Sequence, residues 1–218
     1  GINRFQGIYK FLHEYRDKIT EADELPLLEH WLQTTGEYSE RALAGEVQKT
    51  GSKLLQQVLD WSGKVNESID QLPKKKTKVF TGAKDIISRI CKETDIYIIS
   101  SANREAVCRE WEEASLLNYV TECMTQEKGT KRECLKKVCA FGYEPANVLM
   151  VGDALGDKES ADAAEVPFFP ILAGKEEMSW QEGRGNAFPA WLNGNYTKEM
   201  QQKYESQFYQ NLGRDERK

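Results

Sequence analysis

The pattern of hydrophobic positions changes near residue 79. Before that point, apolar side chains recur every three or four residues, which is the spacing of one face of an α-helix. The clearest sets are Ile8, Phe11, Leu12, Tyr15 and Ile19; Leu25, Leu27, Leu28, Trp31 and Leu32; and Val47, Leu54, Leu55, Val58, Leu59 and Trp61. No strand-like alternation occurs there. We therefore predict a helical unit over residues 1–76, with a helix break at Gly51.

From residue 79 onward, short apolar runs alternate with amphipathic segments. Strands are predicted at residues 95–99, 147–151 and 166–172, the last interrupted by prolines, and helices at 82–92, 103–111, 130–140 and 157–164. This alternation is typical of an α/β fold, so we predict a Rossmann-like, doubly wound parallel sheet over residues 77–173. The polar, aromatic-bearing segment 174–218 is expected to form a helical C-terminal extension that packs over this core.

Composition excludes some classes of partner. The net charge of −5 argues against a nucleic-acid surface, and the basic run at residues 74–76 is expected to be a solvated linker. The five cysteines form no C-x-x-C pair, which favours reduced thiols in the cytoplasm. We find neither a signal peptide nor an apolar stretch near the ~18 residues that a membrane span requires, so no membrane partner is expected.

Polar side chains follow two of the predicted strands. Ser100-Ser101-Ala102-Asn103 comes after the first, where hydroxyl groups and a helix N-terminus suit an anion such as phosphate. Asp153 and Asp157 come after the second, and two carboxylates held this close repel each other unless a cation lies between them. Carboxylate oxygens are ligands that Mg²⁺ prefers. Because ligands of open α/β sheets bind beyond the carboxyl ends of the strands, we predict one shared site there.

A lysine near the start of the helix at 130–140 adds to this site. Lys131 and Lys128 are both candidates for neutralising a phosphoryl oxygen, and Lys131 is the preferred one. Each signal alone has a structural explanation, because Ser100 could cap a helix and a lone lysine or acidic turn could simply be solvated. The ordered combination of the three favours a functional site.

This ordered set resembles the core of the haloacid dehalogenase superfamily. Ser100 matches the second motif of that family, Lys131 a variant of the third without its usual Lys-Pro pair, and Asp153 with Asp157 the fourth. The helical unit resembles the cap domain of many members. The resemblance implies a Mg²⁺-dependent phosphatase that acts on a small phosphorylated substrate through an aspartyl-phosphate. In it, the acidic pair would hold the metal, while Ser100, Ser101, Asn103 and Lys131 would bind the phosphoryl group.

One motif of the family is missing. The first motif is an apolar strand ending in Asp-x-Asp, which supplies the nucleophile, and no strand of this chain leads into that sequence. The missing strand would lie centrally, between the strands that end at Ser100 and Asp153. We therefore expect the chain to be a piece of a protein that begins before Gly1.

Two other functions remain open. One is a catalytically inactive binding or scaffold protein that uses the helical unit and the aromatic residues of the tail, namely Trp180, Trp191, Tyr196, Tyr204, Phe208 and Tyr209. The other is a different reaction on the same fold, such as dehalogenation or phosphoryl-group mutation. The acidic pair favours phosphate chemistry over dehalogenation, which needs no metal. The sequence does not predict an oligomeric state.

Overall fold

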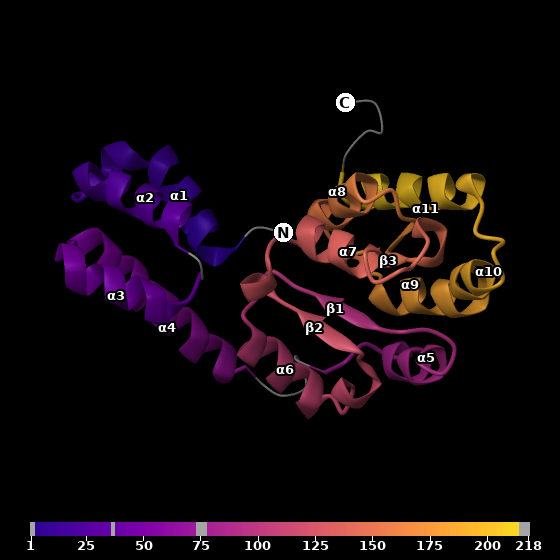
Figure 1. Cartoon of the computed structure of the whole chain (residues 1–218). Coiled ribbons are helices and arrows are strands. Elements are labelled where there is room, and N and C mark those ends of the chain that lie inside the picture. The colour runs from indigo at the N-terminus through magenta and orange to yellow at the C-terminus, as the bar shows by residue number, and fades with distance from the viewer. Residues whose placement is uncertain (1–2, 36–37, 73–77, 214–218) are drawn as a thin grey trace. The chain divides into compact units, whose positions relative to one another are not determined.

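The computed structural model describes residues 3–35, 38–72 and 78–213, and its contacts divide the chain into two compact units. One unit comprises Ile2–Lys78 together with Ser101–Asn103, and the other comprises Val79–Ser100 and Arg104–Lys218. Figure 1 shows the first as helices alone and the second as helices around short strands. The basic run at residues 74–76 lies outside the described residues. No described helix is long and apolar enough to cross a membrane.

The first unit consists of helices throughout its described part. They are α1 (Arg4–Glu14), α2 (Leu25–Thr34), α3 (Glu40–Thr50) and α4 (Lys53–Asp70), with 3₁₀ turns at Arg16–Lys18 and Ala22–Glu24. Side chains of Asn3, Ser39 and Ser52 accept backbone N–H groups at the starts of α1, α3 and α4. Gly51 ends α3 in the left-handed region, at φ +64°. The predicted helix break at Gly51 is therefore confirmed.

The buried face of the helical unit differs from the predicted one at its start. Its core is formed by Phe5, Leu28, Trp31, Leu43, Leu55 and Val58. Phe11, predicted on that face, is 56% exposed, and α1 ends at Glu14 instead of continuing to Ile19. The helix ends there because a 3₁₀ turn follows at Arg16–Lys18, so the apolar spacing across residues 15–19 does not belong to one helix.

The second unit contains the strands. In chain order its elements are α5 (Ala83–Ile90), β1 (Tyr97–Ile99), α6 (Arg104–Glu113), β2 (Glu122–Met124), α7 (Lys131–Cys139), β3 (Met150–Gly152), α8 (Leu155–Ala163), β4 (Phe168–Pro170), α9 (Glu176–Glu182), α10 (Phe188–Leu192) and α11 (Lys198–Asn211). Three 3₁₀ turns (Leu117–Tyr119, Gln126–Lys128 and Pro145–Asn147) and a π-helical turn (Gly183–Ala187) connect them. Sequence reasoning missed β2.

The described strands form two parallel pairs instead of one sheet. β1 pairs with β2, Ile98 lying opposite Cys123, and β3 pairs with β4, Val151 lying opposite Phe169. The predicted α/β class with parallel strands is confirmed. A single doubly wound sheet is not seen among the described residues, because β1 and β3 do not pair with each other.

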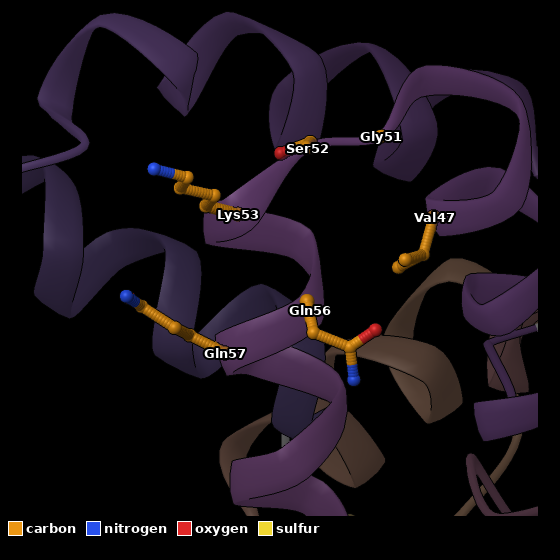
Figure 2. A pocket seen from close by; sticks show the side chains of 6 residues that line it. All are labelled: Val47, Gly51, Ser52, Lys53, Gln56 and Gln57. Atoms are coloured by element: carbon orange, nitrogen blue, oxygen red, sulfur yellow. The ribbon is translucent and has the colours of Figure 1, made fainter.

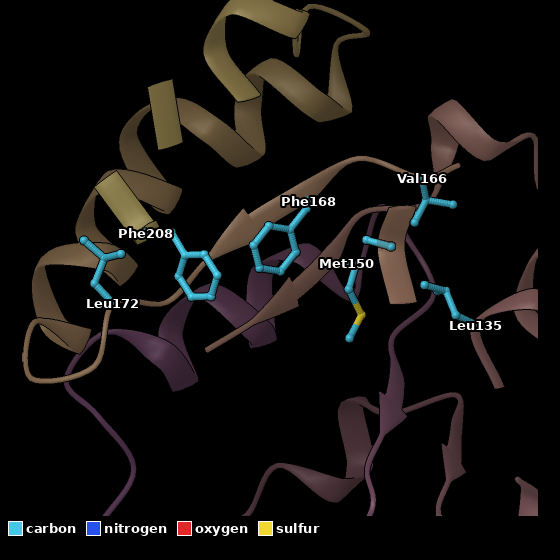
Figure 3. Close-up of a cluster of buried hydrophobic side chains, with 7 residues drawn as sticks. Leu135, Met150, Val166, Phe168, Leu172 and Phe208 are labelled. Atoms are coloured by element: carbon cyan, nitrogen blue, oxygen red, sulfur yellow. The ribbon is translucent and has the colours of Figure 1, made fainter. Parts of the chain in front are cut away.

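Helices cover β4 on both faces, as is usual for parallel strands. Phe168 joins a cluster with Leu135 of α7, Met150 of β3 and Phe208 of α11, shown in Figure 3. The next residue, Phe169, points to the opposite side and packs with α5, α10 and α11 side chains. The tail from residue 174 thus contributes to the same core as the strands.

The aromatic residues of the tail pack mainly within the chain. Phe208 contacts Phe168 edge-on at 5.6 Å between ring centroids, and Tyr204 contacts Phe169 at 5.0 Å. Tyr196 stacks on Tyr204 and donates its hydroxyl hydrogen to the Phe168 carbonyl. These contacts account for the positions of Phe208, Tyr204 and Tyr196 within the core.

Candidate functional site

Ser100 lies directly after β1, at the carboxyl end of the strand. Its backbone N–H donates to the Met124 carbonyl at 3.0 Å, so the β1–β2 ladder continues as far as this residue. The half-buried Ser100 belongs to the same unit as Lys131 and Asp157. Ser101 and Asn103, the other predicted phosphate-binding residues, cluster with the helical unit instead.

A carboxylate already occupies the N-terminus of α6. The Arg104 N–H donates to Glu127 Oε1 at 3.0 Å, and the Thr125 hydroxyl donates to Glu127 Oε2 at 2.5 Å. Burial opposes the ionisation of Glu127, but the hydrogen bonds from Thr125 and Arg104 outweigh it, so the pKa of this carboxyl is lowered. The backbone N–H of Arg104 at this helix end is therefore bound by a side chain of the protein itself. Sequence reasoning missed Glu127, because no local pattern relates it to a helix 23 residues away.

Lys131 and Asp157 form an ion pair. Lys131 Nζ lies 2.5 Å from Asp157 Oδ1, and the two side chains are 20% and 2% exposed. Thr130 and Glu133 form a capping box at the start of α7, which sets the backbone from which Lys131 projects. Lys128, the other candidate, forms its ion pair with Glu122 of β2 instead. Of the two lysines, Lys131 is the one that the structure brings to the acidic loop.

The acidic loop is folded around the carboxylate of Asp157. Asp157 Oδ2 accepts the backbone N–H groups of Asp153, at 3.2 Å, and Ala154, at 3.0 Å. Asp157 lies in the first turn of α8, where the helix dipole also favours a negative charge. A Cβ atom at Gly152 would lie 2.5 Å from the Asp157 carboxyl, so the close approach requires glycine at this position. Asp153 itself is exposed.

The predicted metal ligands are not equivalent. Both oxygens of Asp157 are engaged, one by Lys131 and one by two backbone N–H groups, whereas the Asp153 carboxylate is exposed to solvent. Within the described part of the chain, no group of three or more His, Cys, Asp or Glu side chains could hold a metal ion. A hard carboxylate oxygen suits Mg²⁺, which keeps several water ligands when few protein ligands are present. A Mg²⁺ ion at this loop would therefore find one carboxylate exposed to solvent, that of Asp153, because the Asp157 carboxylate is bound within the protein.

A surface hollow lies elsewhere, in the helical unit. It has a volume of about 380 Å³ and lies between α3 and α4, where Figure 2 shows its lining residues Val47, Gly51, Ser52, Lys53, Gln56 and Gln57. None of the predicted site residues lines it. The residues around Asp157 are therefore a stronger candidate for a functional site than this hollow.

Comparison with known proteins gives one match. A family model described as haloacid dehalogenase-like hydrolase matches residues 3–171, which include the helical unit and the core as far as the end of β4. Neither the curated proteins nor the solved structures contain a match to the chain.

Proposed function

The chain belongs to the haloacid dehalogenase-like hydrolase family, and we propose that it carries most of the active site of a Mg²⁺-dependent phosphatase for a small phosphomonoester. The observation that supports this best is the ion pair of Lys131 with Asp157. It joins two of the three predicted polar groups, which lie 26 residues apart in the chain, at the carboxyl end of β3. A location in the cytoplasm fits the five cysteines, all of which are free thiols.

Each residue of the proposed site has a distinct task. Ser100 donates a hydrogen bond from its hydroxyl to a phosphoryl oxygen. Lys131 offsets negative charge on the phosphoryl group as the transition state forms, and Asp157 holds the ammonium group in place. Asp153 binds Mg²⁺, which would supply electrostatic stabilisation of the phosphoryl oxygens.

No apolar strand predicted in this sequence leads into Asp-x-Asp, the motif that supplies the nucleophile of the proposed reaction. We propose that the nucleophile lies on an additional strand between β1 and β3, which would join the two strand pairs into one doubly wound sheet. The backbone of Ile96 bonds to Thr121, next to β2, and that of Ser100 bonds to Met124 of β2, so by alternation the backbone groups of Ile99 point away from β2. The backbone groups of Met150 and Gly152 bond to the β4 side. The backbone groups of Val151 therefore point away from β4.

The arrangement of α7 supports a position for this strand between the two pairs. Leu135 of α7 belongs to the cluster that contains Met150 of β3, and Ile99 of β1 packs against the same cluster. One helix therefore contacts both strand pairs. An aspartate at the end of an intervening strand would attack phosphorus, and water would then release phosphate from the aspartyl-phosphate.

Binding of Mg²⁺ with inorganic phosphate tests the site in the chain as it stands. We expect the two together to raise the Tm, and Asp153→Asn to remove this increase. Glu159→Gln is a matched control, because Glu159 is an exposed residue of the neighbouring α8. A wild-type Tm that does not change, or an increase that survives Asp153→Asn, contradicts the proposal.

A catalytically inactive binding protein is the alternative, and the missing Asp-x-Asp motif favours it. Phosphatase assays separate the two when the chain is compared with any longer natural form. Turnover in a longer form that carries Asp-x-Asp supports the phosphatase. A longer form that binds phosphate but shows no turnover supports the catalytically inactive binding protein.

A further inference from the structure

The Glu127 carboxylate links the start of α6, which follows Ser100, to the 126–128 turn, which precedes Lys131. Arg104, whose N–H donates to Glu127, lies four positions after Ser100, and Lys131 lies four positions after Glu127. The hydrogen bond thus joins the start of α6 to the segment that leads into α7. These segments lie far apart in the sequence, and the bond closes a loop between them.

The turn that carries Glu127 is itself held firmly. Within it, the Lys128 N–H donates to the Thr125 carbonyl at 2.8 Å. The Lys137 ammonium group, from the far end of α7, donates to the Lys128 carbonyl at 2.6 Å. Thr125, which donates its hydroxyl to Glu127, is only 1% exposed. The 126–128 turn is therefore attached to α7 through Lys137, while Gly129 lies between this turn and the start of α7.

The start of α6 has a second attachment to the same segment. The Arg104 guanidinium donates through Nη1 to the Cys123 carbonyl of β2 at 3.0 Å. If Glu127 is removed, this bond still holds α6 against β2. The loss of the Glu127 carboxylate should therefore change the position of the turn more than the fold of the unit.

We propose that Glu127 is a positioning residue of the phosphoryl site, which keeps the Ser100 hydroxyl and the Lys131 ammonium group at a fixed separation. This inference rests on the proposed function, because it takes both groups to bind one phosphoryl group. Glu127 acts through Arg104 on one side and through the 126–128 turn on the other. It does not contact the substrate.

The test compares three variants. Glu127→Ala removes the link, and Glu127→Gln keeps an amide oxygen that can still accept the Arg104 N–H. Glu105→Gln is the control, because Glu105 is an exposed acid in the first turn of the same helix. For each variant, calorimetric titration measures the affinity for inorganic phosphate with Mg²⁺ present, well below the Tm. Amide hydrogen exchange is measured at Arg104 and across residues 126–131.

We expect Glu127→Ala to weaken phosphate binding about tenfold, the scale of one hydrogen bond to a charged group. Glu127→Gln should recover most of this affinity, and Glu105→Gln should leave it unchanged. Exchange in Glu127→Ala should become faster at Arg104 and across residues 126–131 together. A purely structural cap would lower the Tm without changing phosphate affinity in the folded state.

Two results separate failure of this inference from failure of the proposed function. If the wild-type chain binds phosphate and Glu127→Ala binds it equally well, the positioning role is overturned while the site stands. If the wild-type chain does not bind phosphate, the proposed function fails and the positioning role fails with it. In that case the exchange data still report whether Glu127 links the start of α6 to the 126–128 turn.

Discussion

Replacing Lys131 with alanine should destabilise the strand-containing unit substantially. The change leaves the Asp157 carboxylate, which is 2% exposed, without its cation. Removing one partner of a buried ion pair costs about 3–5 kcal/mol. Here the cost is smaller, because Asp157 keeps the backbone donors of Asp153 and Ala154 and the Lys131 side chain is 20% exposed to water. We expect a loss of about 2–3 kcal/mol in the free energy of unfolding.

Lys128→Ala is the matched control for this change. Lys128 and its partner Glu122 are 39% and 33% exposed, so their ion pair is screened by water. Such pairs contribute about 1 kcal/mol or less. The two lysines are three positions apart in the chain, yet their loss should have clearly different effects.

Urea unfolding, followed by tryptophan fluorescence, measures both variants. With a urea m-value of about 2 kcal/mol/M, Lys131→Ala should lower the midpoint by about 1–1.5 M, and Lys128→Ala by about 0.5 M or less. Adding Asp157→Asn to Lys131→Ala should recover part of the loss, because it removes the unpaired charge while keeping an oxygen for the backbone donors. Equal midpoints for the two lysine variants, or no recovery in the double variant, would refute the assignment of Lys131 as the partner of Asp157.

Three further outcomes are expected. Gly152→Ala should lower the free energy of unfolding by about 1–3 kcal/mol in the same urea assay, because the added Cβ would lie 2.5 Å from the Asp157 carboxyl. Gly63→Ala should instead raise it by about 0.5–1 kcal/mol, since this glycine lies within α4 with open space around its Cβ position, and a loss there would contradict the space seen in the structure. Because the pKa of Glu127 is lowered in the folded state, its stabilising contribution is complete above the pKa of an unfolded glutamate and disappears as the pH falls through the lower, folded value. The stability difference between wild type and Glu127→Gln should therefore shrink below about pH 4, and a difference that grows on acidification would show the opposite shift.

Prediction from the sequence succeeded where short-range chemistry decides the structure. The break at Gly51 was predicted because glycine readily adopts the left-handed conformation that ends α3. The resemblance to the haloacid dehalogenase superfamily is confirmed by the family match over residues 3–171. Both rest on residues close together in the chain or on motifs in a fixed order.

Prediction failed where the pattern was too short or ambiguous. β2 has only three residues, Glu122–Met124, and a polar residue opens it, so no alternation marks it as a strand. Its existence depends on pairing with β1, which is a contact between distant residues. The first helix was predicted too long for a related reason, since apolar spacing continues past Glu14 while the backbone turns into a 3₁₀ segment.

The sequence by itself determined the helical unit, the parallel α/β class and the order of polar groups after the strands, because helix caps, glycine conformations and apolar periodicity act over a few residues. The tertiary structure alone decided that Lys131 and not Lys128 meets Asp157, and that Glu127 occupies the start of α6. It also showed that the described strands form two pairs. These features depend on distances between side chains that are 23 to 26 residues apart, or on which strand edges meet. Packing sets such distances, and local patterns do not encode them.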